Sequence, residues 1–380
     1  VHLISSRRNT QFADFPMPAD YPDYPRHSQV FAYLTDLAEH YQLAAHTRFN
    51  TRVSHMHKDD QGWHLTFADG SQARYEVVVV CNGLLGVPKT PQYPGSFTGD
   101  NLHARDYRSA QQLRGKRVLV VGGGNSGCDI AVDAAQSAAR ALHSTRRGYH
   151  YMPKFIDGQP TQEWLMDQAP KFSDDNAYWA HVQRSFKFAG FDGCDYGLPA
   201  PDHDIRECHP ILNSQILYYI GHGDLHAKPD ISRFDGQQVH FSDGSVETVD
   251  LIVWATGYGI DLPFLPVQVY DWQRDFDSLF LRMLPAQHDD LMFVGYLNTP
   301  SGIGNLANMT GRFIAACIQA RAADSPAWQH LLQIKPQPHV ADLGQQRFMQ
   351  TQRHAHEVDL WKFIRSMNFL TARLSPEARP

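Results

Sequence analysis

The sequence predicts an α/β protein in which two related domains share one chain. The first observation is the stretch VLVVGGGNSGCDIA, from Val118 to Ala131, in which an apolar run, a glycine-rich turn and a helical pattern follow one another. The second is a strand–turn–strand pattern that occurs twice, 174 residues apart, beginning at Phe67 and at Phe241. A length of 380 residues leaves room for two or three domains with large cores.

The glycine-rich turn has the form of a dinucleotide cradle. The apolar run Lys116–Val121 predicts a buried parallel strand, and the residues from Cys128 onward predict a helix. Glycines between such elements let the backbone approach a pyrophosphate, whose charge is held by free N–H groups at the helix N-terminus. The predicted cofactor-binding residues are Gly122, Gly124 and Gly127 of the G-x-G-x-x-G pattern, together with Asn125 and Ser126. The alternative is a glycine-rich turn without a ligand.

The end of the next predicted strand, Arg140–Thr145, indicates which dinucleotide is bound. A site that prefers NADH carries Asp or Glu here, about 20 residues beyond the glycines, to hold the ribose 2′-hydroxyl. This sequence carries Arg146 and Arg147 instead. A pair of guanidinium groups suits a 2′-phosphate, so NADPH is favoured over NADH. The alternative is two solvated arginines on a loop.

The repeat aligns without a gap and predicts a domain duplication. In each copy an Asp-Gly turn leads through a polar link to an apolar strand that ends in glycine. Because the second copy follows the cradle at Gly122, a cradle of its own is expected before the first copy, at a position that precedes Val1. We therefore expect this chain to lack the first βαβ element, through truncation or loss. Asn82, beside the final glycine of the first copy, is a further predicted cofactor contact. The shared residues are Phe67, Asp69, Gly70, Ser71, Val79 and Gly83, matched by Phe241, Asp243, Gly244, Ser245, Val253 and Gly257.

Composition points to a small-molecule enzyme of a reducing compartment. The net charge of -6 argues against a nucleic-acid surface, which needs a local excess of Lys and Arg. The five cysteines are odd in number and form no C-x-x-C pair, so neither a disulfide framework nor a dithiol redox centre is predicted, and no metal site is expected. No run has the length of a membrane span and the start has no signal-peptide pattern. A cytoplasmic protein, with a homodimer as one possible assembly, is the expectation.

A linking motif between the two copies brings in a known family. The segment FTGDNLHARDY has the pattern F-x-G-x-x-x-H-x-x-x-Y, with Phe97, Gly99, His103 and Tyr107 at the fixed positions. By themselves these residues are compatible with domain packing. The pattern is similar, however, to the F-x-G-x-x-x-H fingerprint of the flavin-containing monooxygenases. Related Baeyer–Villiger enzymes usually carry Trp at the position of Tyr107, so that subgroup ranks second. Other segments that resemble the family, in the same order along the chain, are Phe12–Pro18, Tyr24–Pro25, Gly124–Ala131, Ala255–Tyr258 and Phe293–Gly295.

The resemblance implies two Rossmann-like doubly wound domains, with an NADPH-binding domain inserted into an FAD-binding domain. The implied boundaries are 106–258 for the NADPH domain, and 1–105 with 259–380 for the FAD domain. In this family NADPH delivers a hydride to FAD, and the reduced flavin captures dioxygen as a C4a-hydroperoxide that oxygenates a soft nitrogen or sulfur nucleophile. The resemblance thus implies a monooxygenase that uses NADPH and FAD. An uncoupled NADPH oxidase and an inactive NADP(H)-binding fragment are the alternatives.

The resemblance also implies residues near the flavin. Many members carry Asn beside the flavin where alignment on Phe12–Phe15 places Ile4 in this chain. Isoleucine cannot form a hydrogen bond there, and Ser5 is expected to substitute in part. The glycine-rich segment Ser301–Asn305, ahead of an apolar helix expected over 309–320, would direct a helix N-terminus toward the flavin, with Asn305 and Thr310 as contacts. Phe97 and His103 are expected to be architectural.

Overall fold

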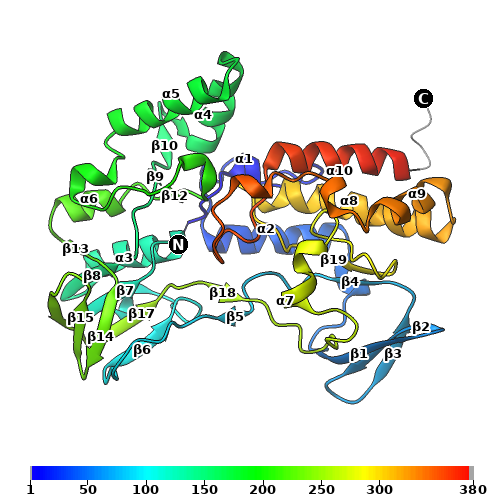
Figure 1. Ribbon diagram of the computed structural model, residues 1–380, viewed down its shortest axis with the longest axis horizontal. Coiled ribbons are helices and arrows are strands. Elements are labelled where there is room, and N and C mark those ends of the chain that lie inside the picture. The colour runs from blue at the N-terminus through cyan, green and yellow to red at the C-terminus, as the bar shows by residue number, and fades with distance from the viewer. Residues whose placement is uncertain (1, 376–380) are drawn as a thin grey trace. The chain divides into compact units, whose positions relative to one another are not determined.

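The computed structural model describes residues 2–375, and the chain folds as two compact units (Figure 1). Unit 1 contains the described part of Val1–Ser6 and all of Pro88–Tyr258, and unit 2 contains Arg7–Val87 and the described part of Gly259–Pro380. Short strands occur at two crossings between the units, β5 (Val87–Pro88) and β18 (Tyr258–Gly259). Both units combine helices with parallel strands, so the predicted α/β class is confirmed.

Unit 1 is built on a five-stranded sheet in the order β13-β8-β7-β17-β6, in which every pair is parallel. The two central strands, β7 and β17, are almost entirely buried, as expected for apolar runs covered on both faces. Their register pairs Val118 with Leu251 and Val121 with Trp254. The strands are β6 (Asp100–His103), β7 (Arg117–Val121), β8 (Arg140–Ser144), β13 (Leu225–Lys228) and β17 (Leu251–Trp254).

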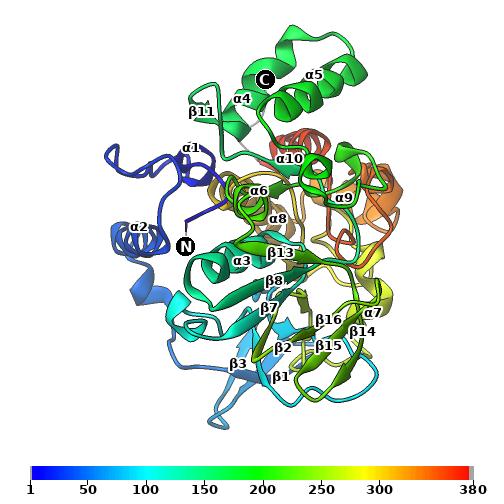
Figure 2. The ribbon, with the colours of Figure 1, turned by 90° about the vertical axis from the view of Figure 1, so that its left-hand side faces the viewer.

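Helices and a small antiparallel sheet cover the two faces of this sheet. Figure 2 shows α3 (Asn125–Ser137) and α6 (Ile216–Gly221) on one face, where Ile130 and Ile216 pack against Val118 and Val120. The other face is covered by β14 (Ile231–Asp235), β15 (Gln238–Phe241) and β16 (Val246–Thr248). Between β8 and α6 the chain forms a module, residues 149–213, that comprises β9 (Tyr151–Met152), β10 (Phe155–Ile156), β11 (Gln159–Pro160), α4 (Thr161–Gln168), α5 (Asp175–Phe188) and β12 (Ile211–Leu212).

The first boundary of this unit differs from the expected one. The family resemblance implied that residues 1–105 belong to the FAD domain, whereas residues 88–105 and the described part of Val1–Ser6 fold in unit 1. The physical reason is β6, which pairs with β17 and whose start is fixed by the Asp100 N–H, donated to Asp250 O at 2.9 Å. The second crossing between the units lies between Tyr258 and Gly259.

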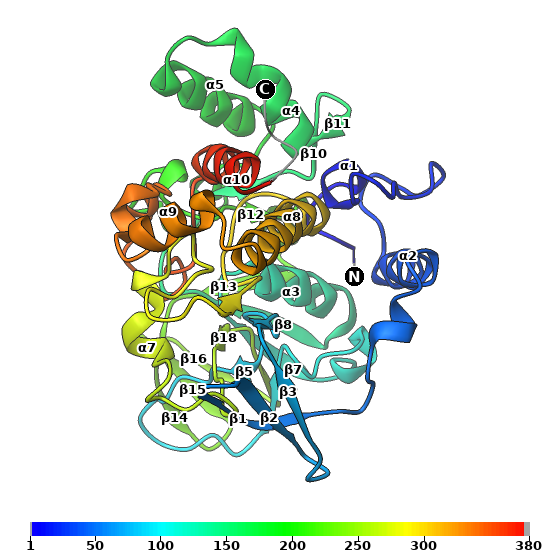
Figure 3. The same ribbon diagram turned by 90° about the vertical axis from the view of Figure 1, so that its right-hand side faces the viewer.

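Unit 2 has a largely helical core. Phe313 and Cys317 of α8 pack with Phe363 and Met367 of α10, and α9 completes the cluster (Figure 3). The helix expected over 309–320 is present as α8, and it is longer than expected. It already begins at Ile303, with Gly302 as its N-cap. The elements are α1 (Arg7–Thr10), α2 (His27–His40), β1 (Val53–Asp59), β2 (Gly62–Phe67), β3 (Gln72–Tyr75), β4 (Val78–Val80), α7 (Trp272–Asp275), β19 (Leu291–Phe293), α8 (Ile303–Ala322), α9 (Pro326–Ile334) and α10 (Leu360–Leu374).

The two copies of the repeat have the same local structure. The Phe67 N–H donates to Ser71 O at 2.9 Å, and the Phe241 N–H donates to Ser245 O at the same distance. Gly70 and Gly244 have φ values of 84° and 83°, which a side chain rarely adopts. The surroundings differ, because β17 lies between β7 and β6, whereas among the described residues β4 pairs with β19 alone. Within residues 2–375, the strand that carries the cradle in unit 1 therefore has no counterpart beside β4.

Candidate nucleotide-binding site

The glycine turn lies where the order of the parallel sheet reverses. The chain leaves β7 at Gly122 and continues through α3 to β8 on one side, while β17 pairs with β7 on the other side. Ligands of open α/β sheets bind outside the carboxyl ends of the strands at such a switch point. The sequence-predicted cradle therefore occupies the position in which this class of sheet holds a nucleotide.

Each glycine of the pattern has its own structural reason. Gly122 has a φ of 119°, and a Cβ there would lie 2.3 Å from Ala255 O. A Cβ on Gly127 would lie 1.9 Å from Gly122 O, so this residue lets α3 pack closely on the turn. Around Gly124 there is no atom within 4 Å of an added Cβ, so this backbone borders open space. These are the three demands of a pyrophosphate cradle: a tight turn, close packing and free approach.

The N-terminus of α3 offers hydrogen-bond donors to that open space. The first intrahelical bond runs from the Cys128 N–H to Gly124 O at 3.0 Å. Within the described residues, the N–H groups of Asn125, Ser126 and Gly127 have no acceptor, and the helix dipole adds partial positive charge at this end. The Asn125 side chain accepts the Leu212 N–H at 2.9 Å, so its amide braces the fold. The residues present thus fit a pyrophosphate bound by backbone.

A buried histidine forms a hydrogen bond with the glycine turn. The ring of His143, on β8, is 2% exposed, and its Nε2 lies 3.0 Å from Gly122 O. Burial lowers the pKa of His143, because the charged imidazolium is poorly solvated there. The neutral ring donates its Nε2–H to the glycine carbonyl. The Gly122 N–H in turn donates to Ser144 O at 3.0 Å, so both backbone polar groups of Gly122 are hydrogen-bonded.

The two predicted arginines follow the end of β8 and have different surroundings. Arg146 is exposed, and no described carboxylate lies within ion-pair distance of its guanidinium. Arg147 is half-buried, and its charge helps to lower the pKa of Asp202, after the hydrogen bond from His203. Arg146 is therefore the better placed of the two to receive a 2′-phosphate, while Arg147 also serves the module.

The residues of the linking motif pack against other residues of unit 1. The Phe97 ring lies 5.7 Å from the Phe234 ring, and a Cβ on Gly99 would lie 2.5 Å from the Phe97 ring. His103 is buried at the end of β6, with its ring edge-on to Tyr258 at 5.1 Å, and burial lowers its pKa. The Tyr107 hydroxyl donates to Asp133 Oδ2 of α3 at 2.7 Å. All four contacts lie within the fold, and the architectural role of Phe97 and His103 stays a prediction.

The residues predicted near a flavin differ in the unit to which they belong, in their exposure and in whether their polar atoms are already hydrogen-bonded. Ile4 and Ser5 are half-buried and belong to unit 1. In unit 2, Asn82 is exposed and its side-chain oxygen accepts the Tyr296 hydroxyl. Asn305 is exposed in the first turn of α8. Thr310 is buried and donates its hydroxyl to Leu306 O at 2.8 Å, so its polar atom is used within α8.

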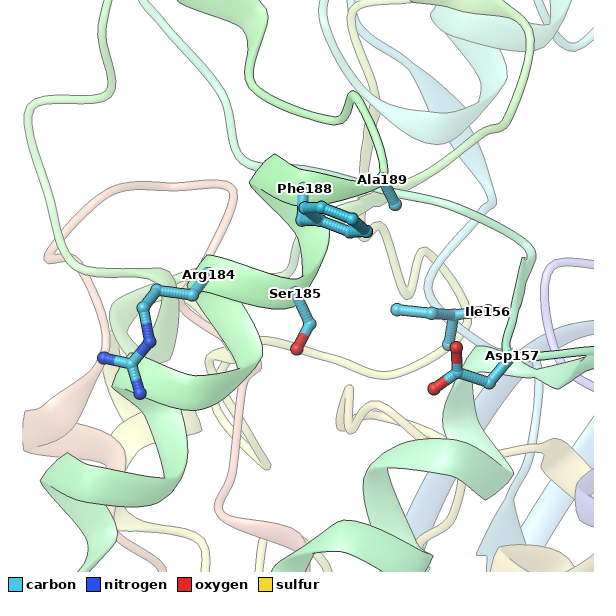
Figure 4. A pocket seen from close by; sticks show the side chains of 6 residues that line it. All are labelled: Ile156, Asp157, Arg184, Ser185, Phe188 and Ala189. Carbon is cyan, nitrogen blue, oxygen red and sulfur yellow. The ribbon is translucent and has the colours of Figure 1, made fainter.

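A separate hollow of about 300 Å³ lies in the module, between β10 and α5. Figure 4 shows Phe188, Ala189 and Ile156 around it, with Arg184 pointing away from Asp157. Asp157 accepts the Trp164 Nε1–H at 2.8 Å and is therefore engaged in the fold. None of the predicted cofactor residues lines this hollow.

The fold and the cradle define a dinucleotide-binding α/β protein of the doubly wound class. The chain belongs to the flavin-binding monooxygenase-like family, whose model matches residues 1–374. It is similar to the human putative dimethylaniline monooxygenase [N-oxide-forming] 6, with 32% identity over 75% of this chain and 56% of that protein. Human flavin-containing monooxygenase 3 is 29% identical over 84% of this chain and 63% of its own length.

A solved structure, the cyclohexanone-bound cyclohexanone monooxygenase in its rotated conformation, has a TM-score of 0.71 and 15% identity. It covers 100% of this chain and 89% of that protein, and at this identity the likeness concerns the fold alone. The family is dependent on FAD and NADPH. The chain spans less than two thirds of the length of the two human relatives. Within residues 2–375, no helix is both long and apolar enough to cross a membrane.

Several residues of the site were not identified from the sequence. Gly123 stands at a variable position of the motif, yet a Cβ there would lie 2.2 Å from the Tyr149 ring. His143 gave no signal, because its partner is a backbone carbonyl 21 residues away. Asp129 offered one: it is a carboxylate directly before the apolar run Ile130–Val132 of α3. The structure places it half-buried, where its Oδ1 accepts the Asn213 side-chain N–H and the Lys154 charge acts to lower its pKa.

Proposed function

We propose that this protein is an NADPH- and FAD-dependent monooxygenase that oxygenates a small nucleophile at nitrogen or sulfur. The single observation that carries the proposal is the cradle at the switch point of unit 1. Among the described residues, three N–H groups at the start of α3 have no acceptor and Arg146, beyond β8, has no ion-pair partner. Family membership supports the flavin chemistry. The nitrogen-directed activity is printed in the name of the human N-oxide-forming relative and is carried to this chain as part of the proposal.

In unit 1 the protein's own groups bind and orient NADPH. The N–H groups of Asn125, Ser126 and Gly127 hold the pyrophosphate, which approaches over the open backbone of Gly124. Arg146 holds the 2′-phosphate, and its guanidinium can make charge-assisted hydrogen bonds to two of the phosphate oxygens. When bound, the cofactors would supply the redox chemistry, namely hydride transfer and the activation of dioxygen. The protein contributes placement and exclusion of water.

For unit 2 we propose that the free edge of β4 takes the strand of a second cradle. Its copy β17 is buried throughout and pairs with the cradle strand β7, whereas Val78 and Val79 of β4 are half-exposed. Two apolar residues of α2 are also uncovered within the described chain, with Phe31 75% and Leu34 43% exposed. A strand, glycine turn and helix against these surfaces would provide N–H groups for the FAD pyrophosphate, as α3 does in unit 1.

A second candidate function is an NADPH oxidase that releases hydrogen peroxide. Ile4 favours it, because an apolar side chain at the position where the family carries Asn cannot donate a hydrogen bond near the flavin. A third candidate is an NADP(H)-binding module without turnover, which the uncovered β4 edge favours. We also propose a cytoplasmic location, in keeping with the odd number of cysteines and the lack of a C-x-x-C pair in the sequence.

One set of assays separates the three. The protein is mixed with FAD, freed of unbound flavin, and supplied with NADPH and a tertiary amine or a thioether. Flavin absorbance, with amine oxide or sulfoxide formed in proportion to NADPH consumed, is the expected result for the complete gene product. Hydrogen peroxide equal to the NADPH consumed would favour the oxidase, and a colourless protein that binds NADPH would favour the module.

The chain as given, residues 1–380, should retain little FAD after gel filtration if the β4 edge needs a second cradle. The same chain with any residues that its gene encodes before Val1 should retain more. Stoichiometric FAD in residues 1–380 alone would contradict the proposal for the β4 edge while leaving the NADPH site untouched.

A further inference from the structure

The segment Leu3–Ser6 is held by the module of residues 149–213. The Lys154 Nζ donates to Leu3 O at 3.0 Å. The Ser6 hydroxyl donates to Glu163 Oε1 at 2.8 Å, and the Ser6 N–H donates to Gln162 Oε1 at 3.2 Å. Three hydrogen bonds over four residues join this segment to the module within unit 1. The segment includes Ile4 and Ser5, the two positions at which the family resemblance places a group beside the flavin.

The same module is fastened to the first two turns of the cradle helix. The Asn125 side chain accepts the Leu212 N–H at 2.9 Å, and one turn later Asp129 Oδ1 accepts the Asn213 side-chain N–H at 2.7 Å. Asn213 Oδ1 accepts the N–H groups of Gln215 and Ile216, each at 2.8 Å, so its orientation is fixed. The cradle end of α3 and β12 therefore move together.

Lys154 connects these two sets of contacts. Burial lowers its pKa, and the carboxylate of Asp129 acts in the opposite direction. The pKa of Asp129 is raised by burial and lowered by the Lys154 charge, so each of the two groups stabilises the charged form of the other. An ammonium near the cradle helix thus donates directly to a backbone carbonyl of the Leu3–Ser6 segment.

We propose that Lys154 is a positioning residue that orders Leu3–Ser6 when the cradle holds a nucleotide. A pyrophosphate bound at the N-terminus of α3 restrains its first turns, and with them Asp129, Asn213 and the ammonium of Lys154. The ordered ammonium in turn fixes Leu3 O, and with it Ile4 and Ser5. The inference rests on the proposed NADP(H) site and adds that nucleotide binding sets the position of the residues aligned with the flavin-facing ones.

The test is hydrogen exchange of residues 2–10, followed by mass spectrometry, with and without NADP⁺. We expect NADP⁺ to slow exchange of the Ser6 amide by at least threefold in the wild type, and to leave it unchanged in Lys154→Met. Lys171→Met, which removes an exposed lysine of the same module, should behave as the wild type. By linkage, Lys154→Met should lower the affinity for NADP⁺ by no more than the factor by which NADP⁺ slows amide exchange in the wild type.

A second variant guards against a folding defect. Lys154→Met combined with Asp129→Asn removes both charges, so that no carboxylate is left buried without its partner. Nucleotide-dependent protection that persists in this variant and in Lys154→Met would overturn the inference. Protection absent from the wild type, although fluorescence titration detects NADP⁺ binding, would also overturn it. A wild type that binds no NADP⁺ would refute the proposed function as well.

Discussion

Replacing two glycines of the cradle by alanine should separate ligand binding from folding. Gly124 and Gly127 are three residues apart in one motif, yet a Cβ meets nothing within 4 Å at Gly124 and lies 1.9 Å from Gly122 O at Gly127. The φ of Gly124 is -78°, which alanine adopts without strain. Gly124→Ala should therefore fold normally, and its methyl group should occupy the space through which the pyrophosphate approaches.

The magnitudes follow from these contacts. Losing one charge-assisted hydrogen bond of ~1.5–3 kcal/mol weakens NADPH binding about 10- to 150-fold in Gly124→Ala. Gly127→Ala gains up to ~1 kcal/mol of helix propensity, but it must move the α3–turn contact at a cost of ~1–3 kcal/mol or more. We expect an unchanged melting temperature for Gly124→Ala and a lower one for Gly127→Ala.

Thermal unfolding and fluorescence titration with NADPH measure the two effects on the same preparations. Gly311→Ala is a matched control, because Gly311 lies inside α8 of unit 2 with open space around an added Cβ. If Gly124→Ala bound NADPH as tightly as the wild type, the pyrophosphate would not pass over this residue. If Gly127→Ala were as stable as the wild type, the close packing of α3 would not matter.

Three further predictions concern single side chains. Arg146→Ala should weaken the binding of NADPH by ~1.5–3 kcal/mol and hardly change the binding of NADH. The exposed Arg184, replaced by Ala, is the control. Equal losses of affinity for both nucleotides in a titration would mean that Arg146 acts on the fold. Burial holds the pKa of His143 in the folded protein below its ordinary 6.5, so the unfolded chain binds this proton more readily. The free energy of unfolding should therefore be unaffected by this group above pH 6.5. Below pH 6.5 it should fall with pH, by at most ~1.4 kcal/mol per pH unit. Urea unfolding between pH 5 and 8 should show a shallower pH dependence in His143→Gln, and an identical slope would exclude His143 as its source. In FAD-loaded protein, Ile4→Asn should raise the share of consumed NADPH that appears as oxygenated product, since a lost hydrogen bond of ~1–3 kcal/mol is restored; an unchanged or lower share would mean that Ser5 or a backbone group has that role.

Local patterns in the sequence predicted the parts of the fold that depend on neighbouring residues. The buried strand over 116–121, the glycine turn and the helix after it depend on apolar periodicity and on backbone freedom, and all three are present. The strand–turn–strand repeat was detectable because Asp-Gly turns fix the same hydrogen bonds in both copies. Arg146 could be singled out because its distance from the glycines is fixed by one helix and one strand.

Features that depend on distant pairing could not be predicted in this way. The assignment of residues 88–105 to unit 1 follows from the pairing of β6 with β17, two segments about 150 residues apart. The early start of α8 depends on close packing of its first turn, since a Cβ on Gly302 would lie 2.1 Å from Asn9 O. Lys154 gave no pattern at all, because its role follows from Leu3 and Asp129, which only the fold brings near.

The most direct test of the account is a crystal structure of this protein with NADP⁺. We expect the pyrophosphate on the N–H groups of Asn125, Ser126 and Gly127, and the 2′-phosphate within about 3 Å of the Arg146 guanidinium. A nucleotide bound away from the glycine turn, or one whose 2′-phosphate points to solvent with Arg146 turned from it, would contradict the assignment of unit 1 as the NADPH site.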